Sequence, residues 1–349
     1  MIDCDISIIC ITYNQVDYIR DAMEGFLSQR GNFTFEIIVN DDCSSDGTTE
    51  ILLEYERRYP GIVKVITHRS NHRGFIDGVR ATRYIIENIA KGDYIALCEG
   101  DDYWISPVKL ATQYDYLEAH QDCNICIHNA YIVDYSHNLI YLSEPRGVDR
   151  NKHFGDIVTE GGGKINPTAS FFFRKGSYGT WLPGPVGDHF TIMSVAQGKD
   201  VHWLSDPMSV YRFKTKGSWS SRDELIDSDG IIRYRDAYIE ALKSMNRQYE
   251  FKFDSYFQTR IEIQGQDARC RHDLAMYQIG RVGLFRLFQR FGLRTSLKGL
   301  LSKHSRTLFH LASSLELLMK AMLTRTLVSR SVSCDAIRPL AVGRDEASR

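Results

Sequence analysis

The stretch that most constrains the fold is residues 94–104, where an apolar run stops abruptly at acidic side chains. Residues 94–98 are apolar, and Glu99, Asp101 and Asp102 follow directly. A short apolar run that ends in a turn predicts a buried strand. In an open α/β sheet, ligands bind beyond the carboxyl ends of the strands, and clustered carboxylates there suit a divalent cation beside a phosphorylated ligand. The alternative is a solvated acidic turn.

Two upstream segments repeat this layout. Residues 5–14 and 35–47 are each an apolar run that ends in polar side chains. Residues 16–29 and 46–59, which follow these runs, carry apolar side chains at helical spacing. This β-α-β-α-β order predicts a parallel, doubly wound sheet with polar groups gathered at one edge.

The order and spacing of these segments resemble the family 2 glycosyltransferases, inverting enzymes of the GT-A fold that transfer a sugar from a nucleotide donor. Downstream segments resemble the acceptor half of capsular polysaccharide and O-antigen enzymes, and the resemblance fades after about residue 225. The matching segments are residues 8–14, 39–48, 91–95 and 99–104, then 168–174, 187–189 and 209–220.

The resemblance implies a metal and donor site at the acidic turn. Asp102 is expected to hold Mn²⁺ or Mg²⁺, and Asp101 is expected to contact the ribose or the water shell of the metal. Glu99 occupies the first acidic position of this DxD-like turn and is assigned to donor binding. Such a site would stabilise the charge that grows on the departing diphosphate.

The same resemblance implies a pocket for the nucleotide base. Asp42 is expected to accept a hydrogen bond from the N3–H of a uracil-type base, with Tyr13 stacking on the ring and Thr12 nearby. The alternative for Asp41 and Asp42 is capping of the following helix. That role suits Asp41 but does not account for Asp42.

Two cations are candidates for the diphosphate. Arg83 matches an arginine common in this helix of the family, and the alternative is a solvated helix arginine. Lys214 lies where related enzymes often carry a histidine. A protonated lysine can contact a diphosphate only as a point charge and cannot ligate a metal, so a second protein ligand from this stretch is not expected.

An inverting transfer needs a base for the acceptor hydroxyl, and Asp188 matches the family position for it. The alternative role for Asp188 is a helix N-cap, and His189 is the second candidate base. The glycines at 161–163 are not flanked by the strand and Lys-Ser/Thr of a phosphate loop, so they predict a flexible loop beside the acceptor.

The expected architecture is an α/β chain with a Rossmann-like mixed, mainly parallel sheet and a C-terminal helical extension. Residues 1–225 form the GT-A domain, with nucleotide-sugar binding in 1–125 and the acceptor side in 126–225. Residues 226–280 form the helical extension, and residues 281–349 form a basic amphipathic helical tail.

The basic tail stands out because the whole chain has a net charge of only −1. Residues 281–349 contain 13 Lys and Arg but only four Asp and Glu. Apolar residues such as Leu284 and Phe288 alternate there with arginines at helical spacing. This pattern predicts a helix lying on an anionic membrane surface, and the alternative is a helix packed on the catalytic domain. Nucleic-acid binding is not expected, because no recognition motif accompanies the charge.

The expected function is metal-dependent, inverting transfer of one sugar from a nucleotide-diphosphate donor, and we expect that donor to be a UDP-sugar. The expected acceptor is a saccharide or lipid-linked saccharide in surface polysaccharide synthesis. The rivals are a sugar-nucleotide nucleotidyltransferase and a non-catalytic nucleotide-sugar binding protein. Acidic residues Asp3 and Asp5 stand where a signal peptide would be basic, so we expect a cytoplasmic protein, peripheral at the inner face of the cytoplasmic membrane if the tail binds lipid.

Overall fold

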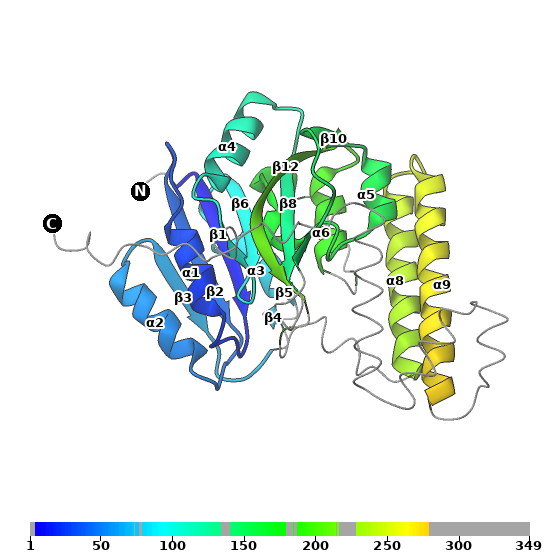
Figure 1. The fold of residues 1–349 in the computed structure, drawn as a ribbon, viewed down its shortest axis with the longest axis horizontal. Helices are drawn as coiled ribbons and strands as arrows, with labels where there is room; N and C mark the ends of the chain where they lie inside the picture. The colour runs from blue at the N-terminus through cyan, green and yellow to red at the C-terminus, as the bar shows by residue number, and fades with distance from the viewer. Residues whose placement is uncertain are drawn as a thin grey trace.

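A mixed ten-stranded sheet organises the chain, in the strand order β10-β12-β8-β11-β6-β1-β2-β3, with β7 paired to β12 and β9 to β8 (Figure 1). The computed structural model describes residues 4–72, 74–76, 79–133, 140–178, 184, 187–213, 215 and 228–278. The strands are β1 (Ile6–Thr12), β2 (Phe35–Asp41), β3 (Val63–Thr67), β4 (Phe75–Ile76), β5 (Val79–Arg80), β6 (Tyr94–Glu99), β7 (Tyr103–Trp104), β8 (Ile125–Val133), β9 (Ile140–Leu142), β10 (Arg150–Lys152), β11 (Phe172–Arg174) and β12 (Val201–Arg212).

The first half of the sheet is parallel. β6, β1, β2 and β3 pair in parallel, so their carboxyl ends share one edge. β8 and β12 form a second parallel pair, and the short antiparallel strand β11 joins it to β6. The mixed, mainly parallel sheet expected from the sequence is therefore confirmed, and β1, β2 and β6 lie within the expected segments 5–14, 35–47 and 94–104.

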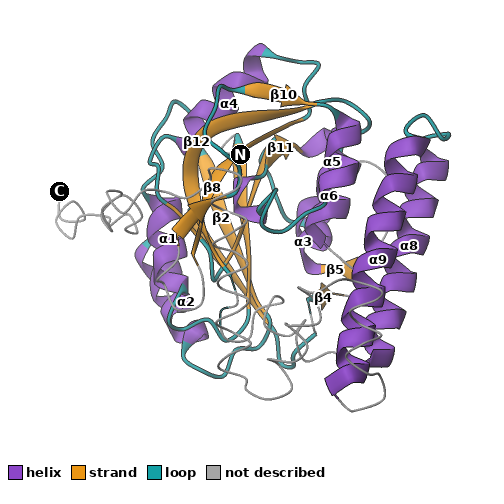
Figure 2. Cartoon of the chain, turned by 45° about the vertical axis from the view of Figure 1, so that its right-hand side comes forward, coloured by secondary structure: helices purple, strands orange, loops and turns teal. Residues whose placement is uncertain are grey.

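Helices cover both faces of the sheet, and two further helices form an outer layer (Figure 2). Figure 1 shows α1, α2 and α4 toward one side and α5 and α6 toward the other, with α8 and α9 outermost. The helices are α1 (Ile19–Leu27), α2 (Thr48–Arg58), α3 (Ala81–Asn88), α4 (Lys109–Ala119), α5 (Phe154–Glu160), α6 (Gly187–Ala196), α8 (Ser228–Gln248) and α9 (Asp254–Gln278), with 3₁₀ turns at η1 (Thr168–Ser170) and η2 (Lys175–Ser177).

Alternation along the strands divides the core between the two faces. In β1, Ile8 and Cys10 pack with α1, α2 and α4, whereas Ile9 packs on the other face with α3, α5 and α6. Leu242 of α8 and Phe257 of α9 belong to that second core. The α8–α9 hairpin thus completes the hydrophobic core of the sheet domain rather than standing apart from it.

The predicted tail, residues 281–349, lies outside the described residues, and so does the expected boundary at residue 225. Among the described helices, none is both long and apolar enough to cross a membrane.

Candidate active site

The acidic turn after β6 lies at the shared carboxyl edge of the parallel strands. The backbone N–H of Asp102 donates to the carbonyl of Glu99 at 3.0 Å, which closes the turn. A side chain at Gly100 would collide with Gln15 and Thr12, so the turn packs directly on the loop after β1. Asp101 and Asp102 are buried, whereas the side chain of Glu99 is exposed.

Residues at the end of β12 and just after it donate hydrogen bonds to the two buried aspartates. The backbone N–H of Arg212 donates to Oδ1 of Asp102 at 2.9 Å, and its guanidinium donates to the carbonyl of Asp101 at 2.9 Å. The hydroxyl of Thr215 donates to Oδ2 of Asp101 at 2.7 Å. These contacts join the acidic turn to β12, which lies in the second half of the sheet.

One carboxylate oxygen in this turn has no partner. Oδ2 of Asp102 is buried and receives no hydrogen bond from any described residue. Burial raises the pKa of Asp102 well above its ordinary value, and the nearby charges of Asp101 and Glu99 raise it further. A buried, unsatisfied carboxylate oxygen beside two other acids is costly, and a bound cation would relieve it.

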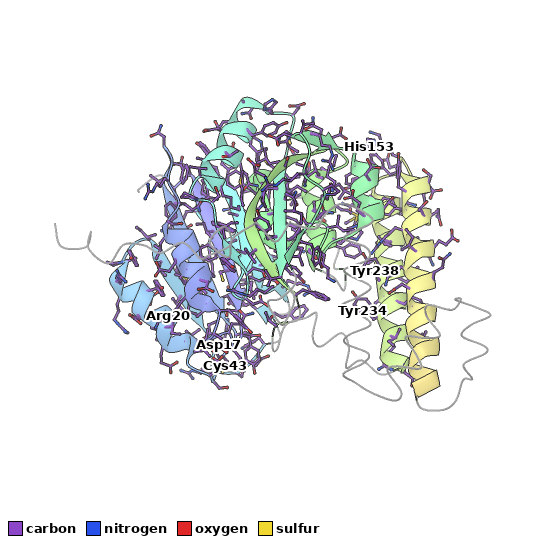
Figure 3. All side chains as sticks on the ribbon, viewed as in Figure 1. Asp17, Arg20, Cys43, His153, Tyr234 and Tyr238 are labelled. Atoms are coloured by element: carbon purple, nitrogen blue, oxygen red, sulfur yellow. The ribbon has the colours of Figure 1, made fainter. Side chains whose placement is uncertain are left out.

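The loops after β1 and β2 are bonded to each other. Asn14 donates its backbone N–H to the hydroxyl of Ser44 at 2.8 Å, and its side-chain oxygen accepts the N–H of Ser45 at 2.8 Å. The backbone N–H of Asp42 donates to the carbonyl of Thr12 at 3.0 Å. Figure 3 shows Asp17 and Cys43, which follow these two strands, at the same end of the molecule.

The structure distinguishes the two acids of the β2 loop. Asp41 accepts hydrogen bonds from the side chains of Ser44, at 2.5 Å, and Thr49, so it ties the loop to the start of α2. The carboxylate of Asp42 accepts the backbone N–H groups of His72, at 2.6 Å, and Gly74, at 2.8 Å. Asp42 therefore anchors the segment after β3, and the base contact predicted for it would have to use the remaining lone pairs.

The other residues predicted for the base lie at the end of β1. The side chain of Thr12 is buried and donates to the side-chain oxygen of Gln15 at 2.7 Å. Tyr13 is 39% exposed, so its side chain is accessible to a ligand. Lys214, predicted to contact the diphosphate, lies outside the described residues.

The two arginines at the start of α3 differ in their surroundings. Arg83 is 31% exposed in its side chain and pairs with Glu87 of the same helix at 2.8 Å. Arg80 lies one residue before the helix, and its guanidinium donates to the carbonyl of Gly184 at 3.2 Å. Burial lowers the pKa of Arg80, and the charges of Asp188 and Glu99 act against that shift. The half-buried cation near Glu99 and Asp188 is thus Arg80, which the sequence analysis passed over for Arg83.

Asp188 lies in the first turn of α6 and faces the glycine loop. Its carboxylate accepts the backbone N–H of Gly163 and, at 2.7 Å, that of His189. A Cβ built on Gly162 would lie 2.5 Å from both carboxylate oxygens, so only glycine fits there. Burial raises the pKa of Asp188 above its ordinary value, and the two N–H donors partly offset the shift. Asp188 therefore lies inside the first turn of α6, where it accepts the N–H of its own neighbour, and its role as the base remains a prediction.

His189, the second candidate base, is fully buried. Its Nδ1 lies 2.5 Å from the hydroxyl of Tyr238, and its Nε2 lies 3.1 Å from the carbonyl of Ile157. A carbonyl can only accept, so Nε2 carries the proton and Nδ1 accepts from the tyrosine. Burial lowers the pKa of His189 to about 3. With both nitrogens engaged, His189 is a structural neighbour of Asp188.

The acidic turn and Asp188 share neighbours. The charges of Asp102, Glu99, Asp101 and Asp188 all act on Tyr211 of β12 and, together with burial, raise its pKa. Arg80 likewise lies near both Glu99 and Asp188. The structure therefore brings the acidic turn at the carboxyl edge and the candidate base of α6 to the same part of the molecule.

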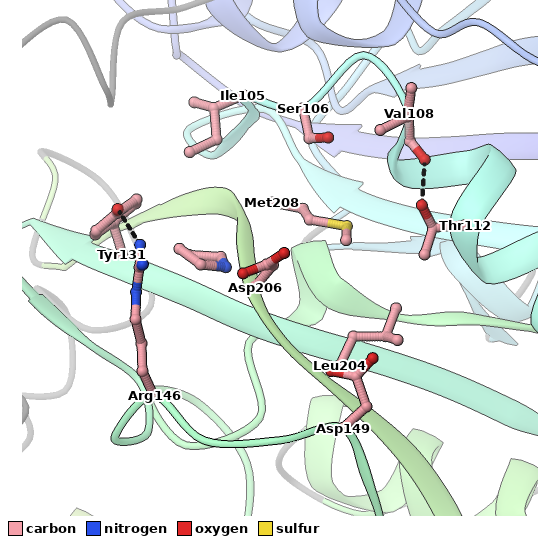
Figure 4. A pocket seen from close by; sticks show the side chains of 11 residues that line it. Ile105, Ser106, Val108, Thr112, Tyr131, Arg146, Asp149, Leu204, Asp206 and Met208 are labelled. Atoms are coloured by element: carbon pink, nitrogen blue, oxygen red, sulfur yellow. Dashed lines mark hydrogen bonds between the residues drawn. The ribbon is translucent and has the colours of Figure 1, made fainter.

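A separate hollow of about 410 Å³ lies past the other end of the β7–β12 pairing, around Ile105, Tyr131 and Met208 (Figure 4). The hydroxyl of Tyr131 accepts from Arg146 at its rim at 3.3 Å. None of the residues predicted for the donor or the base lines it.

Comparison with known proteins identifies the family. Residues 7–180 match the family model described as Glycosyl transferase family 2. The chain belongs to glycosyltransferase family 2. The match includes the strand ends, Arg80 and the acidic turn, and it ends before Asp188 and the α8–α9 hairpin. The predicted family and the GT-A type of α/β fold are confirmed.

Named relatives of this family 2 chain cover part of its length. An uncharacterised protein of Mycobacterium tuberculosis is 34% identical over 217 residues, which are 62% of this chain and 60% of that protein. An Escherichia coli protein named UDP-Glc:alpha-D-GlcNAc-diphosphoundecaprenol beta-1,3-glucosyltransferase is 34% identical over 113 residues, 32% of this chain and 41% of that protein. The chain thus matches less than two thirds of the length of either relative.

Among solved structures, S. aureus TarS in complex with UDP-GlcNAc aligns with a TM-score of 0.49 at 16% identity, over 92% of each chain. A likeness this distant carries neither ligands nor residue roles to the present family 2 chain.

Proposed function

We propose that this family 2 chain is an inverting glycosyltransferase that moves one sugar from a nucleotide-diphosphate donor, a UDP-sugar by preference, to a saccharide or lipid-linked saccharide acceptor. The observation that carries the proposal is that two acids, Asp102 and Asp188, both lie near Tyr211, and that Arg80 also lies near Asp188. Asp102 has an unsatisfied buried oxygen at the strand edge, and Asp188 has a raised pKa at the start of α6.

The donor would lie along the carboxyl edge of β1, β2 and β6. Tyr13 offers an exposed ring for the base, with Thr12 and Asp42 beside it. The diphosphate then falls near the acidic turn and Arg80, whose half-buried guanidinium is suited to bind an anion. Asp101 remains the candidate for the ribose or the water shell of the metal, and Glu99 remains assigned to donor binding at the first acidic position of the turn. Lys214 stays a predicted contact to the diphosphate, whereas for Arg83, which pairs with Glu87, we favour the alternative of a solvated helix arginine.

The acidic turn suits a divalent cation that the donor completes. In the described part of the chain, no three His, Cys, Asp or Glu side chains group so as to hold a metal by themselves. Mg²⁺ is commonly bound by one or two carboxylates together with substrate phosphates and water, which matches Asp102 with Asp101 beside it. Bound there, Mn²⁺ or Mg²⁺ would supply charge neutralisation for the leaving diphosphate.

Asp188 would act as the base. The acceptor oxygen forms a bond to the anomeric carbon, the bond from that carbon to the diphosphate oxygen breaks, and the hydroxyl proton passes to the carboxylate of Asp188. The nucleoside diphosphate leaves with the electron pair. Because burial raises the pKa of Asp188, its basicity lies closer to neutral pH than that of an exposed aspartate, which favours proton transfer.

The acceptor class is supported by the names of relatives. One is named a glucosyltransferase acting on a diphosphoundecaprenol-linked sugar, and another, from Bacillus spizizenii, a poly(ribitol-phosphate) beta-glucosyltransferase, 32% identical over 117 residues. Both names refer to cell-surface polymers or their lipid-linked precursors. We therefore place this chain in surface polysaccharide synthesis of the capsular or O-antigen type, at the inner face of the cytoplasmic membrane, with residues 281–349 as the anionic-lipid contact.

A panel of nucleotide sugars tests the proposal. A UDP-sugar with Mn²⁺ should raise the melting temperature, because a ligand that binds only the folded state stabilises it by mass action, and a chelator should remove most of the shift. Sugar transfer to a lipid-linked acceptor should follow with the same donor. Equal shifts from nucleoside triphosphates would favour a nucleotidyltransferase, and binding without any turnover would favour a non-catalytic binding protein.

A further inference from the structure

One arginine of the α8–α9 hairpin, Arg260, packs near the candidate base, Asp188. Arg260 of α9 donates from one Nη to the hydroxyl of Tyr238 on α8 at 3.3 Å and from the other to the carbonyl of Thr159 at the end of α5 at 3.4 Å. Figure 3 shows Tyr238 on the side of α8 that faces the sheet. The same hydroxyl lies 2.5 Å from Nδ1 of His189, the residue that follows Asp188.

The glycine loop lies between Arg260 and Asp188. A Cβ built on Gly161 would lie 2.7 Å from an Nη atom of Arg260, and one built on Gly162 would meet the carboxylate of Asp188. Two consecutive residues with no side chain therefore let the guanidinium and the carboxylate approach the loop closely. Close packing of this kind favours a fixed relative position of the two charged groups.

The hydrogen bonds of Arg260 are incomplete. Its hydrogen bonds to Tyr238 and Thr159 are both long, and its Nε is buried with no partner among the described residues. An unsatisfied buried donor is destabilising, so a purely structural arginine would be expected to find better partners. Burial raises the pKa of Asp188, and the charge of Arg260, across the loop, acts against that shift and so favours the ionised carboxylate.

We propose that Arg260 is a positioning residue for sugar transfer, which keeps the carboxylate of Asp188 ionised and aimed through the Gly161–Gly163 loop, and that the α8–α9 hairpin is thereby part of the catalytic centre. The inference rests on the proposed role of Asp188 as base. It assigns a function to a hairpin that lies beyond the residues matched by the family model.

Other charged or titratable groups also face Asp188. Arg80 at the start of α3, Tyr211 of β12 and Tyr238 of α8 all sense its charge. The tyrosine hydroxyls are buried and have raised pKa values, so they stay neutral over the working pH range. Among the described residues, Arg80 and Arg260 are cations that act on the carboxylate, and Arg260 is the one that we do not propose as a donor contact.

The test is the ionisation of Asp188 itself, followed by ¹³C NMR of side-chain-labelled aspartate. The Asp188 signal is identified by its loss in Asp188→Asn. Arg260→Gln should raise the titration midpoint by about one pH unit, because an opposite charge has been removed, and Arg260→Lys should restore most of the shift. Lys243→Gln, which removes an exposed cation of α8 that pairs with Glu240, is the matched control and should leave the midpoint unchanged.

Turnover provides the second readout. In Arg260→Gln, the acid limb of the pH profile for transfer should move to higher pH in step with the NMR midpoint, while the affinity for the donor stays the same. A loss of rate that is uniform across pH, with an unmoved midpoint, would show that Arg260 is only structural and would overturn the inference. If Arg260→Gln does not fold, Arg260→Met removes the charge and keeps an apolar stem over the ring of Tyr238, and a midpoint unmoved there overturns the inference equally.

The NMR midpoint does not depend on sugar transfer. A raised midpoint in Arg260→Gln supports the coupling of Arg260 to Asp188. Absence of transfer by the wild-type chain with every donor would overturn the proposed function, and a midpoint insensitive to Arg260 in an active enzyme would overturn this inference alone.

Discussion

Replacing Gly162 by alanine should impair the candidate base, Asp188, without substituting that residue itself. The added methyl carbon would lie 2.5 Å from both carboxylate oxygens of Asp188, whereas carbon atoms in ordinary contact need about 3.5 Å. The loop and the carboxylate must therefore separate by about 1 Å. A displacement of that size at a reacting group costs on the order of 10²-fold in rate, so we expect turnover to fall by about that factor.

The assay is release of UDP from the donor that gives the largest thermal shift, measured with and without acceptor. Gly176→Ala is the matched control, because a Cβ there meets no atom within 4 Å. Neither glycine has a positive φ, so alanine adds no backbone strain at either position. The double variant with Asp188→Asn should be no slower than Asp188→Asn alone, since effects through one group do not add. Near-wild-type turnover in Gly162→Ala, or full additivity in the double variant, would refute the reasoning.

Three further predictions follow from single residues. Asp102→Asn should reduce turnover by about 10²-fold or more, about 3 kcal/mol in the barrier, in a folded protein, and a fully active variant would remove Asp102 from the metal site. Arg80→Gln should weaken donor binding and turnover about tenfold or more, while Arg83→Gln, which loses only a surface pair, should change either by less than twofold; the reverse order would restore the original assignment to Arg83. Burial lowers the pKa of Lys109 to about 7 from 10.5. Between these values the unfolded chain binds more protons, so the free energy of unfolding should rise with pH by up to about 1.4 kcal/mol per unit. Urea unfolding at pH 7 and 9 should show this rise in the wild type and not in Lys109→Met. An equal change in the free energy of unfolding in the two proteins would contradict the prediction.

The strands and the acidic turn could be predicted because their signal is local. An apolar run that stops at Glu99 needs no knowledge of the rest of the chain to be recognised as the end of a strand. Arg80 could not be separated from Arg83 in this way, since the two differ by less than one helical turn. What separates them is that Arg80 has extended backbone angles just before α3, whereas Arg83 lies inside the helix and meets Glu87.

The surroundings of Asp188 are determined by residues far away in the sequence. Arg260 and Tyr238 come from helices whose amphipathic pattern shows only that they pack, and not what their polar residues touch. The glycines at 161–163, expected to form a flexible loop, instead pack between Arg260 and Asp188. No spacing rule links these positions, because the contact exists only after the hairpin has joined the core.

Strand β12 imposes a register requirement that its composition does not reveal. Its pairing with β8 shifts between Leu204 and Pro207 and again between Pro207 and Ser209. Beyond these irregularities, Tyr211 and Arg212 point to opposite faces of the sheet, as neighbours on a strand must. Deleting one residue in the irregular stretch would leave an equally apolar strand yet exchange these two side chains, and the acidic turn would lose its partner. Among relatives, insertions and deletions between 204 and 209 should therefore occur only in compensated forms.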